Sequence, residues 1–188
     1  MQKEQALALL EKKNLDLQKV KEIFEAFRND MEVVGKVAMN LSLRTSVYDR
    51  EKGKSPVMTE LLVALSDVPD MGSRWAVAKN PHTPTHILAK LAHDEVNLVR
   101  ALVATNPNTP QECLYTLFDD EKIVRDGISG NPNAPGELLD KLAKDPDKLV
   151  RLRVAENPAT PRETLQKLAQ DLDKDVSKAA EIRLGKSA

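Results

Sequence analysis

Arginines recur along the chain at a spacing that could recognise phosphate or carboxylate groups. Each stands three residues before an aliphatic side chain, and together they are Arg74, Arg100, Arg125 and Arg151. If the segments that carry them stack, the guanidinium groups form a row, and planar guanidinium groups bind phosphates and carboxylates through paired hydrogen bonds.

A structural role for the same arginines is the alternative, and the sequence favours it. An Asp precedes each arginine by about six residues, as Asp94 precedes Arg100. An Asp–Arg ladder through Asp94, Asp120 and Asp145 would brace neighbouring segments, and the acidic neighbours would weaken the positive field that a phosphate needs.

Histidines and a cysteine are the remaining candidates for metal or thiol chemistry. His86 and His93 would lie about 10 Å apart along one helix, so one ion cannot readily bind both of them and His82. We therefore predict surface histidines, with a two-ligand site at His82 and His86 as the alternative. Cys113 is the only cysteine, and it shares a repeat position with the apolar Ile87, so it is predicted to be a buried core residue. No cofactor or metal is predicted.

Catalysis has little support in the sequence. There is no glycine-rich phosphate loop and no G-x-S-x-G or H-E-x-x-H motif. Glu112, Glu137 and Glu163 recur near predicted helix starts, where a carboxylate satisfies free backbone N–H groups. The chain is therefore predicted not to be an enzyme.

The elements that position these residues form a repeat. Four stretches align: VAKNPHTP, VATNPNTP, ISGNPNAP and VAENPATP. Their asparagines are Asn80, Asn106, Asn131 and Asn157, with spacings of 26, 25 and 26 residues. A period of this length leaves room for two short helices per unit. The Asn side chains are predicted to bond to backbone where each second helix ends, and so to form a ladder along the stack.

Each unit has a predicted helix start and an apolar stripe. Thr83, Thr109 and Thr160 stand before a proline, so we expect the threonine to be the N-cap and the proline the first helical residue. Glu112 and Glu163 would complete capping boxes. Leucines follow the proline at the fourth and seventh positions, which places them on one helical face. The asparagine before the next proline ends the second helix.

The repeated pattern VAxNPxTPxxxLxxLAxDxxxxVR resembles the leucine-rich repeat variant family, and good copies cover roughly residues 74–177. The resemblance implies an all-α fold, a right-handed HEAT-like superhelix in which α-helices alternate with short α- or 3₁₀-type helices. Some members of that family carry an iron–sulfur centre on N-terminal cysteines. This chain has no cysteine before Cys113, so that cofactor is not expected here.

The whole chain, 1–188, is predicted to be one α-solenoid domain of about six units. Residues 1–40 would form an N-terminal cap, with a helix at about 2–13, and a degenerate repeat. An insertion loop would occupy 41–55, the repeats 55–182 and a C-terminal tail 183–188.

Two departures from the repeat are candidate binding features. The insertion at 41–55 carries Tyr48, Arg50 and Lys52, and insertions in solenoids often lie on the binding face. Trp75 stands where the other units have Ala101, Asp126 and Leu152, so this position is not expected to be deep core. An exposed Trp beside Arg74 would anchor a partner, although a packing role for the ring is equally consistent with the sequence.

Charge and hydropathy limit the function further. Basic residues number 28 and acidic residues 29, which gives a net charge of −1 and no overall attraction to nucleic acid or membranes. The apolar run from Ala6 to Leu10 is too short for a signal peptide or a membrane span, so we expect a cytoplasmic protein with no membrane partner. The predicted function is a non-catalytic scaffold for an unidentified protein partner, with nucleic-acid binding through the arginines as the alternative.

Overall fold

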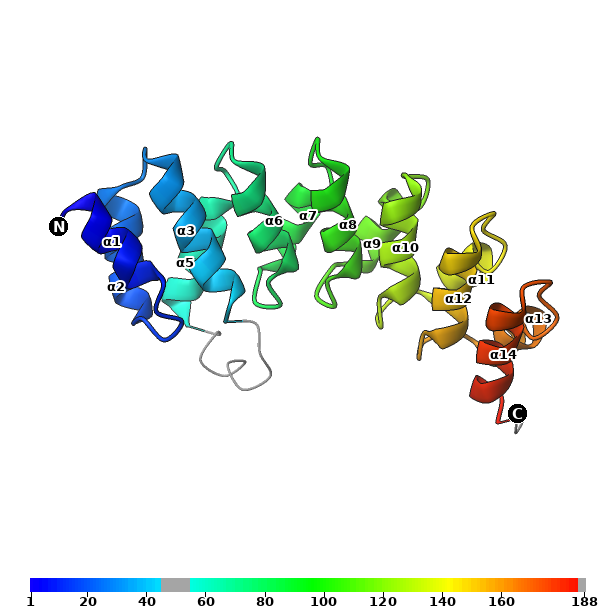
Figure 1. Cartoon of the computed structure of the whole chain (residues 1–188). Helices are drawn as coiled ribbons and strands as arrows, with labels where there is room; N and C mark the ends of the chain where they lie inside the picture. The colour runs from blue at the N-terminus through cyan, green and yellow to red at the C-terminus, as the bar shows by residue number, and fades with distance from the viewer. Residues whose placement is uncertain (45–54, 186–188) are drawn as a thin grey trace. The chain divides into compact units, whose positions relative to one another are not determined.

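The computed structural model describes residues 1–44 and 55–185, and within them it is entirely helical, with no strand (Figure 1). Tyr48, Arg50 and Lys52, predicted as binding residues of the insertion, lie outside the described residues. The chain divides into two compact units, one from Met1 to Leu91 and one from Ala92 onward. No described helix is long and apolar enough to span a bilayer.

The first unit begins with α1 (Lys3–Leu10), the helix predicted at the N-terminal end. It continues with α2 (Leu17–Ala26), α3 (Met31–Ser42), α5 (Pro56–Leu65), α6 (Met71–Lys79) and α7 (Thr85–Leu91). Helix α3 packs against α1, α2, α5 and α6. Its aliphatic residues Val33, Val37 and Leu41 are fully buried, which explains why α3 is central to this unit.

The second unit contains α8 (Asn97–Thr105), α9 (Gln111–Thr116), α10 (Lys122–Gly130), α11 (Gly136–Leu142), α12 (Lys148–Glu156), α13 (Arg162–Leu168) and α14 (Lys174–Arg183). Its second helices pack in series, α8 on α10, α10 on α12 and α12 on α14. The predicted leucine stripe is buried throughout, at Leu114, Leu117, Leu139, Leu142, Leu165 and Leu168. The predicted all-α fold of six helix pairs is therefore confirmed in the described residues.

Gly127 allows α10 to approach α8 closely. A Cβ atom at this position would lie 2.7 Å from the backbone oxygen of Ala101 and 2.9 Å from the Cβ of Ala104. Only glycine fits there without a shift of the backbone.

The predicted helix starts are wrong by one residue. Pro110 and Pro161 are N-cap residues, and their helices begin one residue later without a side-chain cap. Helix α7 likewise begins at Thr85, one residue after Pro84. The capping boxes predicted for Glu112 and Glu163 are therefore not formed, although both carboxylates still lie in the first helical turn.

The threonines hydrogen-bond backward instead of forward. The Thr109 hydroxyl donates to the Val103 carbonyl at 2.5 Å, and Thr83 and Thr160 make the same bond to Val77 and Val154 at 2.6 Å. Each of these carbonyls also accepts the backbone N–H of the asparagine three residues later, so the threonine supplies a second donor at the buried end of the preceding helix. Both helices of each described pair are α-helical, so the 3₁₀ type that the resemblance allows is not observed.

Candidate functional site

The repeated arginines join neighbouring repeats. Arg100 on α8 donates from Nε and Nη2 to the two carboxylate oxygens of Asp120, at 2.6 and 2.8 Å, and from Nη1 to the Asp94 carbonyl at 2.7 Å. The same set of bonds recurs between Arg125 and Asp145 and between Arg151 and Asp171. We call these three Arg–Asp pairs the clamps.

The clamps confirm the predicted Asp–Arg ladder and show which repeats it joins. Asp94 offers Arg100 its backbone carbonyl. Its side chain accepts the backbone N–H of Val96 at 2.9 Å, which holds the turn before α8. The arginine therefore reaches the carboxylate of the following repeat, 20 residues along the chain.

The clamps are mostly buried, and each arginine stabilises the charged form of its aspartate. The side chains of Arg100 and Asp120 are only 18% and 15% exposed. The hydrogen bond from Arg100 lowers the pKa of Asp120, and the bond from Arg151 does the same for Asp171. In Arg100, Arg125 and Arg151, Nε and Nη2 thus bind a carboxylate and Nη1 binds a backbone carbonyl, so these arginines do not form a stripe that faces phosphates.

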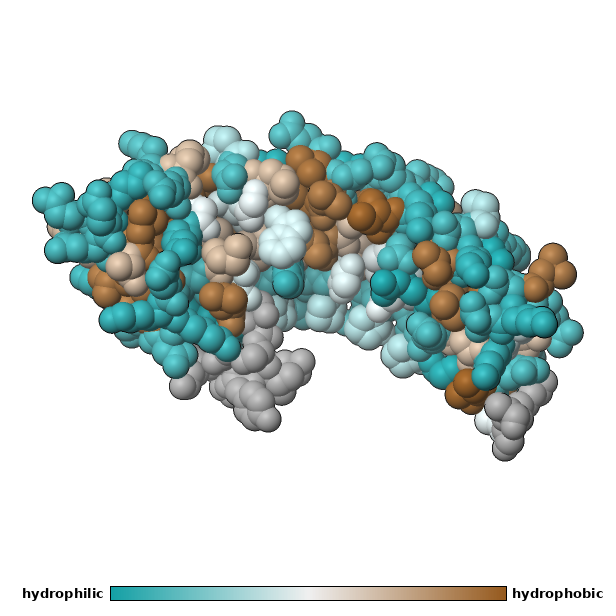
Figure 2. Space-filling model, viewed as in Figure 1, coloured by the Kyte–Doolittle hydropathy of each residue, from teal (hydrophilic) through white to brown (hydrophobic). Residues whose placement is uncertain are grey.

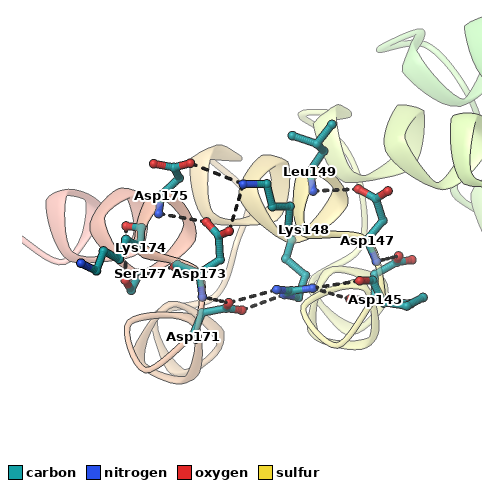
Figure 3. A network of polar contacts seen from close by, with 11 residues as sticks. Asp145, Asp147, Lys148, Leu149, Asp171, Asp173, Lys174, Asp175 and Ser177 are labelled. Atoms are coloured by element: carbon teal, nitrogen blue, oxygen red, sulfur yellow. Dashed lines mark hydrogen bonds and ion pairs between the residues drawn. The ribbon is translucent and has the colours of Figure 1, made fainter.

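A second series of contacts lies beside the clamps. The Lys148 ammonium lies 3.0 Å from Asp173 and 3.7 Å from Asp175, both at the start of the next second helix (Figure 3). Lys122 approaches Asp147 in the same way at 3.4 Å. These exposed pairs repeat the spacing of the clamps but contribute less stability, because solvent screens them.

The asparagine ladder is confirmed. Asn131 is fully buried, and its Nδ2 donates to the carbonyls of Ala104 at 2.7 Å and Asn106 at 3.0 Å. Its Oδ1 accepts the backbone N–H of Asn133 at 2.8 Å. Asn157 makes the same contacts one repeat further along the chain. The predicted polar columns are therefore parts of the stacking interface.

Arg74 and Trp75 belong to the first unit. Arg74 is buried and donates to the Pro69 carbonyl at 2.6 Å. Trp75 is half-buried, as expected for a position outside the deep core, and the Lys79 ammonium lies 4.9 Å from the centre of its ring. That distance is a cation–π contact.

The other reactive side chains form no site in the described residues. His86 and His93 are exposed, and no group of three or more His, Cys, Asp or Glu residues in the described part of the chain could hold a metal ion. Cys113 is buried, and burial raises the pKa of its thiol. It therefore lies in the core, in agreement with its apolar repeat position.

A feature that the sequence analysis missed is a row of exposed aliphatic side chains on the second unit. Leu98, Ile123 and Leu149 are 44%, 40% and 48% exposed. Each is the second residue of its helix, on α8, α10 and α12, and we call the three the aliphatic row. Figure 2 shows apolar side chains among the polar ones on the face that carries these helices. The repeat alignment shows an aliphatic residue at this position in three successive repeats, but the exposure of these side chains is seen only in the structure.

These features define a helical-repeat protein in which polar ladders join neighbouring repeats of the second unit. The sequence model of the family described as leucine rich repeat variant matches residues 149–173, which include Arg151, Asn157 and Asp171. A solved structure described as a leucine-rich repeat variant with a novel repetitive structural motif is similar, with a TM-score of 0.54 and 23% sequence identity. The similarity covers 96% of this chain and 81% of that one, and it shows a shared fold. The resemblance to leucine-rich repeat variants is thereby confirmed. No curated protein matches the chain.

Proposed function

We propose that the protein is a non-catalytic helical-repeat scaffold that binds a protein partner through the aliphatic row. The observation that carries this proposal is the exposure of Leu98, Ile123 and Leu149 at the same position of successive helices. Aliphatic side chains grouped on a surface favour association, because a partner that covers them removes apolar area from water.

Packing supports the row as one surface. Helix α10 lies against both α8 and α12, so the row crosses three adjacent helices. Leu102 and Leu152, one helical turn after Leu98 and Leu149, are half-buried and extend the apolar area. The clamps do not require these side chains, so their repetition calls for a role other than stacking.

The arginines are not included among the proposed contacts, because the clamps account for Arg100, Arg125 and Arg151. No observation favours nucleic-acid binding over protein binding. Trp75 with Lys79 remains a proposed anchor in the first unit, and the residues of the insertion remain a sequence-based proposal.

Site-specific photocrosslinking tests this function. A photoreactive residue at position 123 should capture a defined protein in cells of the native source. The matched control is position 115. Tyr115 is 43% exposed, as Ile123 is 40% exposed, but it lies on α9, the first helix of its pair, and so outside the aliphatic row. Equal labelling from both positions, or labelling of nucleic acid from position 123, would contradict the proposal.

A further inference from the structure

We infer that the partner presents a positively charged amphipathic segment, whose apolar side chains cover the aliphatic row. This inference rests on the proposed function and adds the chemistry of the partner. The evidence for it is the charge of the residues beside the aliphatic row and the spacing of α8, α10 and α12.

The row lies at the acidic ends of its helices. Because Ile123 and Leu149 are second residues of α10 and α12, they adjoin the loops that enter these helices. Those loops are rich in Asp and Glu, and the clamps neutralise one carboxylate in each of three loops, namely Asp120, Asp145 and Asp171.

Further carboxylates at this edge remain incompletely compensated. Glu121 accepts a hydrogen bond from the neutral amide of Asn97 at 2.7 Å. Asp119 is exposed and forms no ion pair within the described residues. Lys148 is shared between Asp173 and Asp175, and the Asp175 side chain is 76% exposed (Figure 3).

The second unit as a whole also carries a net negative charge. From Ala92 onward the sequence holds 14 Lys and Arg against 17 Asp and Glu, a net charge of −3. The residues up to Leu91 hold 14 and 12, a net charge of +2. Lys122, Lys148 and Lys174 are exposed cations at the edge and offset part of the surplus, the first two through their pairs with Asp147 and Asp173. A cationic segment is therefore attracted to this surface, and a polyanion is repelled from it.

The spacing of the row matches that of a helical partner. Packed helices lie about 8–10 Å apart, and a helix rises about 10.5 Å in seven residues. Apolar residues of a partner helix at i, i+7 and i+14 would therefore meet Leu98, Ile123 and Leu149 in turn. Lysines or arginines beside them would face Asp119, Glu121 and Asp175.

The test uses three synthetic peptides and the full chain. The first is a helical peptide with leucines on one face at seven-residue spacing and lysines beside them. The second replaces every lysine with glutamate, and the third scrambles the first. Fluorescence anisotropy should show the lysine peptide binding at least about tenfold more tightly than either control, with affinity falling as salt rises.

Variants of the protein test whether the peptide binds to the aliphatic row and to the carboxylates beside it. Ile123→Ser should weaken the lysine peptide by about tenfold or more, whereas Tyr115→Ser should leave its affinity unchanged. Glu121→Gln combined with Asp175→Asn should weaken it several-fold and reduce its salt dependence. Circular dichroism of each variant should match that of the wild type, because all four side chains are exposed.

The outcomes separate this inference from the proposed function. Equal binding of the glutamate peptide, lost in Ile123→Ser, would overturn the charge assignment and leave the aliphatic row as a protein-binding surface. Binding of the lysine peptide that Ile123→Ser does not change, or no binding near about 1 mM, would overturn the inference. Failure of photocrosslinking at position 123 would in addition remove the proposed function.

Discussion

The two units of the chain are built from the same kind of helix pair, but the polar contacts between neighbouring repeats differ within each unit. In the second unit, clamps and buried asparagines recur from repeat to repeat. In the first unit, the arginine position of α3 is occupied by Val34, which is fully buried. Asn40 still donates to backbone carbonyls, but to those of Leu10 and Lys12 after the N-terminal helix α1.

An exposed ion pair joins α2 and α5 in the first unit. Lys21 on α2 lies 2.6 Å from Glu60 on α5, and the Glu60 side chain is largely exposed. Such pairs contribute about 0–1 kcal/mol, whereas removal of one partner from a mostly buried clamp should cost about 2 kcal/mol. The comparison teaches that α3 packs in this fold with an aliphatic residue, Val34, at the arginine position, whereas clamps join the repeats of the second unit.

The largest expected effect comes from the asparagine ladder. Asn131→Ala should lower the free energy of unfolding by about 3 kcal/mol, because it removes the side-chain donor to the Ala104 and Asn106 carbonyls and the acceptor of the Asn133 N–H in a buried position. Asn133→Ala is the matched control, since Asn133 also bonds to the preceding repeat but is exposed. Chemical denaturation should show less than about 1 kcal/mol for the control. Equal effects would mean that burial does not distinguish the two asparagines.

Replacement of a glycine by alanine should have opposite effects on stability in the two units. Gly127→Ala should destabilise by about 2 kcal/mol, because its Cβ would overlap the backbone of α8. Gly35→Ala on α3 should stabilise by up to about 1 kcal/mol, because a Cβ there meets nothing within 4 Å and alanine favours the helix. Thermal unfolding of both variants checks this pair. A stabilising Gly127→Ala would show that α8 and α10 are not packed as described.

Acid should weaken the second unit through its clamps. The pKa of Asp120 and of Asp171 is lowered on folding by the arginine bonds. The charged carboxylates therefore contribute stability above the unfolded pKa of about 3.9, and this contribution is lost as the pH falls through the lower folded value.

Arg100→Met should accordingly cost about 1–2 kcal/mol at pH 7, and the difference from wild type should shrink below about pH 3. Hydrogen exchange measured against pH can follow α8 and α10 separately from the first unit. A constant difference at all pH values would contradict an electrostatic clamp.

Much of the fold could be predicted because every repeat must solve the same stacking problem. The leucine stripe, the asparagine ladder and the link between arginines and aspartates all follow from positions that recur at about 25 residues. The partner of Arg100 could not be assigned, because the sequence does not show whether an Asp pairs within its own repeat or with the previous one. The threonine bonds also depend on a three-dimensional competition between a helix end and a helix start.

The candidate site was harder to predict than the fold. The arginines attracted a binding hypothesis because their chemistry is visible in the sequence, but burial beside Asp120, Asp145 and Asp171 gives them a structural role. Leu98, Ile123 and Leu149 appear in the sequence as ordinary aliphatic residues. Their exposure depends on which side of each short second helix faces its neighbours, and so it becomes visible only in the packed structure.

The central claim is that stacking and binding are performed by different side chains of the same helix. Arg125 and Ile123, two residues apart on α10, test it most directly when unfolding and lysine-peptide affinity are measured on Arg125→Ala and Ile123→Ser. We predict that Arg125→Ala lowers the melting temperature by about 5 °C or more, while the folded protein keeps its affinity within about twofold. Ile123→Ser should keep the melting temperature and lose about tenfold or more in affinity. Loss of affinity in folded Arg125→Ala together with unchanged affinity in Ile123→Ser would contradict the account.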